Sequence, residues 1–520
     1  MLLLQKKLAL YWGDVLALCS GALFPLAFAP FEWRLTLFVS LFLLLLTWQD
    51  VSAKRAFLRG WLWGLGAYLV GVSWVYNSMH DFGGAPPLAA AAFTLVFAAY
   101  LALYPALAGS VLVRFFSRSS GVFYAFAFGL IWALSEWLRS WVLTGFPWLM
   151  SGYALLDTPF AAYMPVLGSL GASVLMACTV ACFGLCLLQT AKRLQVGILA
   201  VLLVVGGVSL SLVDWKADGA VKTLDVALVQ GNVPQELKLR SDSLNVSLQT
   251  YFELSQPHFG ADLIVWPETA MPTYRYAIQG FLNKVAAEAE KVGSTVFTGI
   301  FFRAENGQDY YNAMLEVGGE WQSYKKHQLV PFGEYMPVRW ALTLFSRFVD
   351  IPMSDMAVAP LTRSPLSLAG VNIANSICYE MAYPDVLRAQ MNGAELMLNT
   401  SNDAWFGDSF AAHQHLEMAR VRAKEFAKPI VRATNNGITA VLSYEGEVTA
   451  MIKQFQPGVL RHELALNSVK TAYAHVGQLL LACLIFLVLV LLVLFSTKGS
   501  TGSQVLESNK SNPHRGQLPR

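Results

Sequence analysis

The chain has 520 residues, of which 55% are hydrophobic and only 14% are charged, and its net charge is +3. Because soluble globular proteins carry about 25% charged residues, much of this chain must face something other than water. The small net charge and the absence of a long basic stripe argue against nucleic-acid binding. The length allows two or more domains.

Apolar segments long enough to cross a bilayer recur before residue 214. They predict seven spans, at roughly 10–30, 34–49, 56–78, 88–114, 121–140, 165–189 and 195–213, and an eighth at about 472–496. The alternative for the first segment is a cleaved secretory signal. It is disfavoured because Pro30 would directly follow the cut after Ala29.

Basic residues gather in alternate loops, which predicts the orientation of the spans. These residues are Lys6, Lys7, Lys54, Arg55, Arg59, Arg114, Arg118, Lys192, Arg193 and Lys498. Since such loops stay in the cytoplasm, both termini are predicted to be cytoplasmic. The predicted domains are a membrane domain at 1–214, a catalytic domain on the far side at 215–470, a C-terminal transmembrane helix at 471–497 and a disordered cytoplasmic tail at 498–520.

Glu136 and Arg139 are charged residues near the outer end of the fifth predicted span. A charge inside a membrane is a functional hypothesis by default. At a spacing of three residues they can also pair with each other on one helix face. Both interpretations stay open from the sequence.

From residue 223 the pattern changes to short apolar runs alternating with amphipathic segments. Strands are predicted at 224–230, 263–268, 295–300, 395–399 and 438–442, and helices at 278–291 and 413–426. This alternation predicts a layered α/β domain. His413 and His415 are two residues apart and fall on different helix faces. They are interpreted as ordinary polar positions, and no metal site is predicted.

Cys378 is the only cysteine of the soluble stretch, since the other five lie in apolar runs. An unpaired thiol outside the cytoplasm is either inert or kept for its reactivity. Cys378, Glu268 and Lys326 each follow or lie near a predicted strand. A carboxylate can take the thiol proton, the thiolate can attack a carbonyl, and an ammonium can stabilise the oxyanion. Taken singly, Cys378 is also compatible with an inert buried cysteine and Glu268 with a solvated glutamate. Lys326 is also compatible with a solvated Lys325–Lys326 pair.

Three motifs in order resemble the Glu-Lys-Cys signature of the nitrilase superfamily: Trp266-Pro267-Glu268-Thr269, Lys326 ahead of Leu329-Val330-Pro331-Phe332-Gly333-Glu334, and Ile377-Cys378-Tyr379-Glu380. The segments 229–232, 399–406 and 432–437 match as well. A nitrilase-like domain between seven spans and an eighth resembles the apolipoprotein N-acyltransferase family over about residues 1–496.

The resemblance implies an αββα sandwich on the periplasmic side of a bacterial inner membrane, working as a monomer without a cofactor. The thiol would take an acyl chain from a phospholipid and pass it to the α-amine of the N-terminal diacylglyceryl-cysteine of an apolipoprotein. Glu268 would be the general base, Lys326 the oxyanion stabiliser and Cys378 the nucleophile. Glu334, Tyr379 and Glu380 would support them. Leu239 departs from the family, whose members carry tryptophan at about this place.

Residues 335–360 are too apolar for a free loop in water, and they include Trp340, Phe345 and Phe348. They are predicted to form a lid that dips into the outer leaflet, with packing on the domain itself as the alternative. Two rival functions are a membrane-tethered amidase, which has no evident need for seven spans, and a transporter. The spans lack the internal repeat that a transporter would favour.

Overall fold

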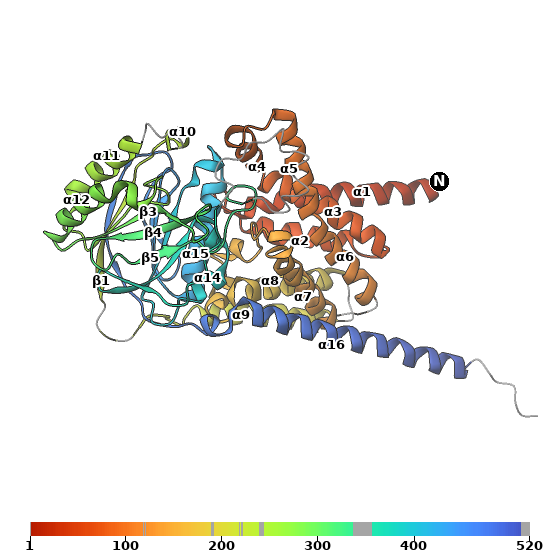
Figure 1. Cartoon of the computed structure of the whole chain (residues 1–520). Coiled ribbons are helices and arrows are strands. Elements are labelled where there is room, and N and C mark those ends of the chain that lie inside the picture. The colour runs from red at the N-terminus through yellow and green to blue at the C-terminus, as the bar shows by residue number, and fades with distance from the viewer. Residues whose placement is uncertain are drawn as a thin grey trace, which may run out of the picture.

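The computed structural model describes residues 2–117, 119, 121–188, 192–217, 219, 222–238, 244–335 and 356–510. Its first part is a helical bundle and its second part a two-sheet domain (Figure 1). The bundle helices are α1 (Leu2–Leu23), α2 (Leu35–Thr47), α3 (Ala53–Gly71), α4 (Val75–Asn77), α5 (Pro87–Leu101), α6 (Leu103–Phe116), α7 (Val122–Arg139), α8 (Met164–Leu188) and α9 (Arg193–Leu210). Helix α16 (Ala472–Lys510) joins them after the sheet domain.

Five helical segments of the described chain are long and apolar enough to cross a membrane: Pro87–Phe116, Val122–Arg139, Pro159–Leu188, Arg193–Leu210 and Ala472–Leu494. Length and composition alone therefore support five of the eight predicted spans; the shorter apolar helices Tyr11–Ala27 and Leu35–Thr47 and the charged α3 correspond to the other three. Helix α2 has only 13 residues, which is about 20 Å of helix against a hydrocarbon core of about 30 Å. Helix α3 carries Lys54, Arg55 and Arg59. Large exposed apolar side chains on α9 mark a surface that suits lipid, which agrees with a membrane protein.

The second part is built on two six-stranded sheets. The first sheet has the order β12-β1-β2-β3-β4-β5 and the second has the order β11-β10-β9-β8-β7-β6. The strands are β1 (Thr223–Gln230), β2 (Leu263–Val265), β3 (Thr295–Arg303), β4 (Tyr310–Val317), β5 (Ser323–Lys325), β6 (Leu366–Leu368), β7 (Val371–Ile377), β8 (Leu396–Ser401), β9 (Ile430–Thr434), β10 (Thr439–Leu442), β11 (Val448–Ile452) and β12 (Gly458–Ala465). Strands β1, β2 and β3 run parallel, as do β7, β8 and β9.

The two sheets pack face to face, because their strands alternate apolar side chains into one shared core. Val226 and Val265 of the first sheet meet Ile373 and Leu398 of the second in this core. Helices α11 (Leu244–Ser255) and α12 (Gln279–Glu290) cover the outer face of the first sheet. Helices α14 (Pro384–Arg388) and α15 (Ala411–Phe426) cover the second. The predicted αββα sandwich is confirmed.

Helices α14 and α15 lie between the second sheet and the bundle (Figure 1). One continuous apolar core runs from the bundle through α15 to the outer face of the second sheet. At the other end of the chain, α16 continues to Lys510, into the segment predicted as a disordered tail. No proline interrupts the chain there before Pro513.

Candidate active site

Three predicted residues meet at the carboxyl ends of strands from both sheets. Glu268 follows β2, Lys326 follows β5 and Cys378 follows β7. All three are buried. Gly299 on β3 lets the Glu268 segment approach closely, because a Cβ at this position would lie 2.4 Å from the carbonyl oxygen of Pro267. The fold therefore brings together residues that lie about 50 to 60 positions apart in the sequence.

The Cys378 backbone has a φ of 49°, in the left-handed region. This conformation costs a non-glycine residue about 1–2 kcal/mol, and it turns the chain sharply from β7 into a short helix at Cys378–Ala382. Burial raises the pKa of the Cys378 thiol well above its usual value, and the nearby Glu268 carboxylate raises it further against the opposing effect of Lys326. The resting group is a thiol, so it needs a base before it can attack.

Glu268 is held by three donors on its two oxygens. Asn312 Nδ2 and Lys326 Nζ donate to Oε1 at 2.7 and 3.1 Å, and the backbone N–H of Asn402 donates to Oε2 at 2.8 Å. Lys326 Nζ also donates to Glu334 Oε1 at 2.6 Å. Burial alone would lower the pKa of Lys326, but these two carboxylates raise it well above its usual value. Lys326 is thus a fixed cation, as stabilising an oxyanion requires.

The neighbouring Lys325 has a different environment. Its Nζ lies 4.6 Å from the ring centroid of Tyr311 and takes no part in the Glu268–Glu334 network. Of the two lysines, Lys326 is therefore the one that contacts Glu268 and Glu334.

The Glu380 carboxylate ties the Cys378 turn to the segment after β5. Its Oε1 accepts the backbone N–H groups of His327 and Gln328 at 2.7 and 3.0 Å. Its Oε2 accepts the backbone N–H of Ile377 at 2.7 Å and the hydroxyl of Tyr324 at 2.9 Å. Glu380 therefore fixes Cys378 and Lys326 relative to each other.

Tyr379, directly after Cys378, contacts the bundle. Its hydroxyl donates to the carbonyl of Gly145 at 3.2 Å and accepts from the hydroxyl of Tyr383, also at 3.2 Å. These contacts join the Cys378 turn to the segment that follows α7. Glu334 contacts Lys326 directly, Glu380 contacts the backbone next to Lys326 and Cys378, and Tyr379 connects the Cys378 turn to the bundle.

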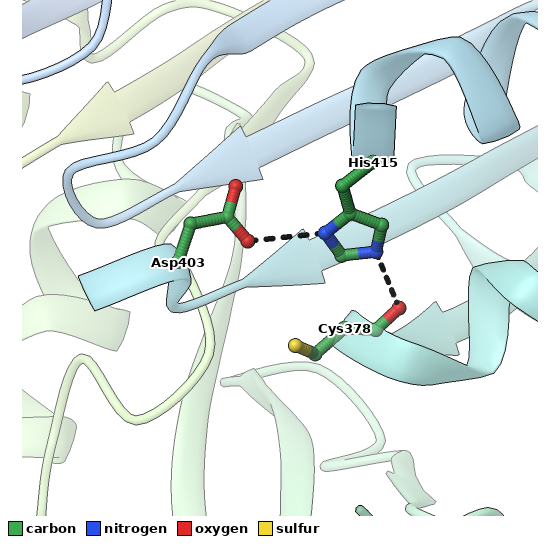
Figure 2. Close-up of side chains that lie close together, drawn as sticks. All are labelled: Cys378, Asp403 and His415. Atoms are coloured by element: carbon green, nitrogen blue, oxygen red, sulfur yellow. Dashed lines mark hydrogen bonds and ion pairs between the residues drawn. The ribbon is translucent and has the colours of Figure 1, made fainter. Parts of the chain in front are cut away.

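His415, on α15, holds the other side of the turn (Figure 2). Its Nε2 donates to the carbonyl of Cys378 at 3.0 Å, and its Nδ1 lies 3.0 Å from Nη2 of Arg432 and 3.1 Å from Asp403. Burial and Arg432 lower the pKa of His415, which favours a neutral ring whose Nδ1 accepts from Arg432. The interpretation of His415 as an ordinary polar position was therefore wrong, since its neighbours were not visible in the helix pattern.

Cys378, Asp403 and His415 offer three potential metal-ligand atoms within 4.8 Å of one another. Their polar atoms are already engaged, however. His415 Nε2 donates to a carbonyl, and Arg432 donates to Asp403 at 2.9 Å. Burial alone would raise the pKa of Asp403, but the Arg432 guanidinium lowers it well below its usual value. The cluster is a hydrogen-bonded support for the turn.

The sequence left open whether Glu136 and Arg139 pair with each other or have another function. In the structure, both side chains bind the segment after α7. Arg139 donates to the carbonyls of Phe146, Trp148 and Leu149 at 2.9, 2.5 and 3.3 Å. Glu136 accepts the backbone N–H and the hydroxyl of Ser151 at 2.6 and 2.9 Å. Within the described chain, no ion pair joins Glu136 to Arg139. They hold the segment that contacts Tyr379.

A cavity of about 440 Å³ lies beside Tyr383 at the junction of the bundle and the sheet domain. It is lined by the ends of α7, α14 and α16, including Trp137, Trp141 and Leu479.

Leu239, Trp340, Phe345 and Phe348 lie outside the described residues, so the lid stays a prediction. Sequence reasoning gave no role to Asn312, which lies in no recognised motif, or to Asn402, although Asn402 lies within the matching segment 399–406.

Comparison with known proteins agrees with this architecture. Residues 20–182 match the apolipoprotein N-acyltransferase N-terminal domain, and residues 225–474 match the carbon-nitrogen hydrolase family. An apolipoprotein N-acyltransferase of Shewanella oneidensis is 38% identical over 488 residues, covering 90% of this chain and 93% of that protein. One of Pseudomonas syringae pv. tomato is 39% identical over 477 residues, covering 89% and 93%. The chain belongs to the apolipoprotein N-acyltransferase family.

Proposed function

We propose that Cys378 carries the acyl chain as a thioester, with Glu268 as general base and Lys326 as oxyanion stabiliser. The donor is a phospholipid and the acceptor is the α-amine of the N-terminal diacylglyceryl-cysteine of an apolipoprotein. The observation that carries this proposal is the convergence of the three side chains in a buried site beside the bundle.

In the first half-reaction, Glu268 takes the thiol proton and the Cys378 sulfur attacks the ester carbonyl. The oxyanion forms beside Lys326. The intermediate then releases the lysophospholipid oxygen, which receives the proton held by Glu268. This leaves a thioester on Cys378 and restores the carboxylate.

In the second half-reaction, the acceptor amine attacks the thioester carbonyl. The amine loses a proton to Glu268 as the new C–N bond forms, and the thiolate leaves and regains that proton. The products are an amide and the free thiol. Burial of the centre limits access of water, which favours the amine over hydrolysis.

The substrates are lipids, and two features of the junction suit them. The cavity beside Tyr383 is large enough for part of a ligand and is lined mainly by apolar groups. It also lies where the bundle meets the catalytic domain. The predicted lid at 335–360 would cover the site from the lipid side.

The proposed location is a bacterial inner membrane, with the catalytic domain in the periplasm and both termini in the cytoplasm. Support comes from the basic residues of alternate loops. The working form is proposed to be a monomer. A single cysteine introduced at the exposed Val292, in a variant whose other cysteines are replaced, tests the orientation. A membrane-impermeant thiol reagent should label it in cells with a permeable outer membrane and an intact inner membrane.

The main experiment uses purified protein and a phospholipid with a labelled acyl chain. The label should appear on Cys378 and be discharged by a lipopeptide amine. Discharge mainly by water would instead support the amidase hypothesis. A Cys378→Ala variant that still acylates lipopeptide would refute the assignment of the nucleophile.

A further inference from the structure

Lys238 is a buried cation that the mechanism above does not use. It is the last residue of α10 (Gln235–Lys238), and its side chain is only 4% exposed. Its Nζ has no hydrogen-bond partner within the described part of the chain. An unpaired buried ammonium costs several kcal/mol, so a lysine at this place calls for a function.

Helix α10 places Lys238 beside the catalytic centre. Gln235 lies three residues earlier, on the same helix face, and its Oε1 accepts from Asn402 Nδ2 at 2.8 Å. The backbone N–H of Asn402 donates in turn to Glu268. Burial lowers the pKa of Lys238 to about 7, against the opposing effect of the Glu268 carboxylate. Lys238 therefore lies near Glu268, although no hydrogen bond joins the two side chains.

The charged groups around Cys378 leave Lys238 available to bind an anion. Lys326 donates to Glu268 and Glu334, and its third donor is left for the oxyanion, so a phosphate needs another partner. Lys238 Nζ has no acceptor among the residues that the structure describes, and a phosphate oxygen is a strong acceptor for an ammonium. In a glycerophospholipid the phosphate is attached to the same glycerol as the acyl esters. A carbonyl at Cys378 thus brings a phosphate near the catalytic centre.

We propose that Lys238 binds the phosphate of the donor phospholipid while the acyl ester lies against Cys378. This inference rests on the proposed function, and it adds a site that acts in only one half-reaction. The acceptor lipopeptide has a diacylglyceryl group without phosphate. Lys238 therefore selects the donor and has no part in aminolysis.

The test compares Lys238→Met and Lys238→Arg with wild type in single-turnover thioester formation on Cys378. One donor is a phospholipid with a labelled acyl chain, and the other is diacylglycerol with the same chains. Each variant is compared with wild type on the same donor. Lys325→Met is the matched control, because Lys325 directly precedes Lys326 but makes no contact with Glu268.

Lys238→Met should slow thioester formation from the phospholipid by roughly tenfold to a hundredfold, the effect of one charge-assisted hydrogen bond. Lys238→Arg should retain most of the rate. Diacylglycerol should react within about threefold of wild type, which also shows that the variant is folded. Discharge of a preformed thioester by lipopeptide amine should be unchanged in both variants.

Two results would overturn the inference. An equal loss with both donors would show that Lys238 acts on Glu268 rather than on phosphate, and no loss with either donor would show that it does neither. Failure of the proposed function looks different, because wild-type protein would then form no thioester on Cys378 from either donor.

Discussion

Glu380→Gln provides a sharp test of how the site is held together. The carboxylate accepts four hydrogen bonds, and three of them come from backbone N–H groups, which can only donate. A glutamine has one oxygen in place of two, so its NH₂ group must face at least one of these donors. The variant loses at least one hydrogen bond to a charged group, worth about 1.5–3 kcal/mol, and leaves a buried N–H unsatisfied.

The remaining bonds also lose their charge assistance, so the total loss is about 3 kcal/mol or more. If this energy positions Cys378 against Lys326 in the transition state, the rate of thioester formation should fall by roughly 10²-fold. The assay is rapid-quench measurement of the labelled thioester, with thermal unfolding measured in parallel. Glu316→Gln is the control, since Glu316 is a buried carboxylate that accepts the backbone N–H of Gln322 at 3.1 Å outside the catalytic network. A wild-type rate for Glu380→Gln would refute the positioning role.

Three further outcomes are expected. Cys378→Ser should form no detectable acyl-enzyme, because Glu268 must then deprotonate a much weaker acid; mass spectrometry of the protein after incubation with phospholipid checks this. Arg139→Lys should lower the acylation rate by roughly tenfold with little change in the apparent KM for donor, since a lysine does not reproduce the three carbonyl contacts of Arg139; a loss confined to KM would contradict this role. Because the pKa of His415 is lowered below its ordinary value of 6.5, its contribution to stability is present above pH 6.5 and is lost as the pH falls toward the folded-state pKa. The unfolding temperature of wild type should therefore fall more between pH 7.5 and 5.5 than that of His415→Gln, and equal falls would refute it.

The sequence predicted the sandwich and the three convergent residues for a physical reason. Apolar runs mark buried strands, and the polar residues Glu268 and Cys378 stand where such runs end. The ordered motifs then indicated which polar residues belong together. What the sequence lacked was contact between distant segments. Nothing local shows that the N–H of Asn402 reaches Glu268 or that His415 reaches the Cys378 carbonyl.

The bundle was predicted less well than the catalytic domain. Hydropathy locates apolar runs, but it does not show where a helix ends, so the predicted span at 34–49 contains a helix of only 13 residues, α2. Likewise, the spacing of Glu136 and Arg139 suggested a pair on one helix face. Their partners are backbone groups at residues 146–151, and such a folded-back segment leaves no periodic signal.

Helix α15 has a consequence for any attempt to work with the catalytic domain alone. Gln414 accepts from Trp148, Glu417 accepts from Arg34, and Glu425 accepts the backbone N–H of Ser169, all of them groups of the bundle. A fragment starting near residue 215 would leave these polar atoms without hydrogen-bond partners. It would also expose the apolar surface that the bundle now covers. Such a fragment should aggregate, and His415 would lose the support that sets its position. The membrane part is in this sense the fifth layer of the enzyme, and the catalytic half is not a separable module.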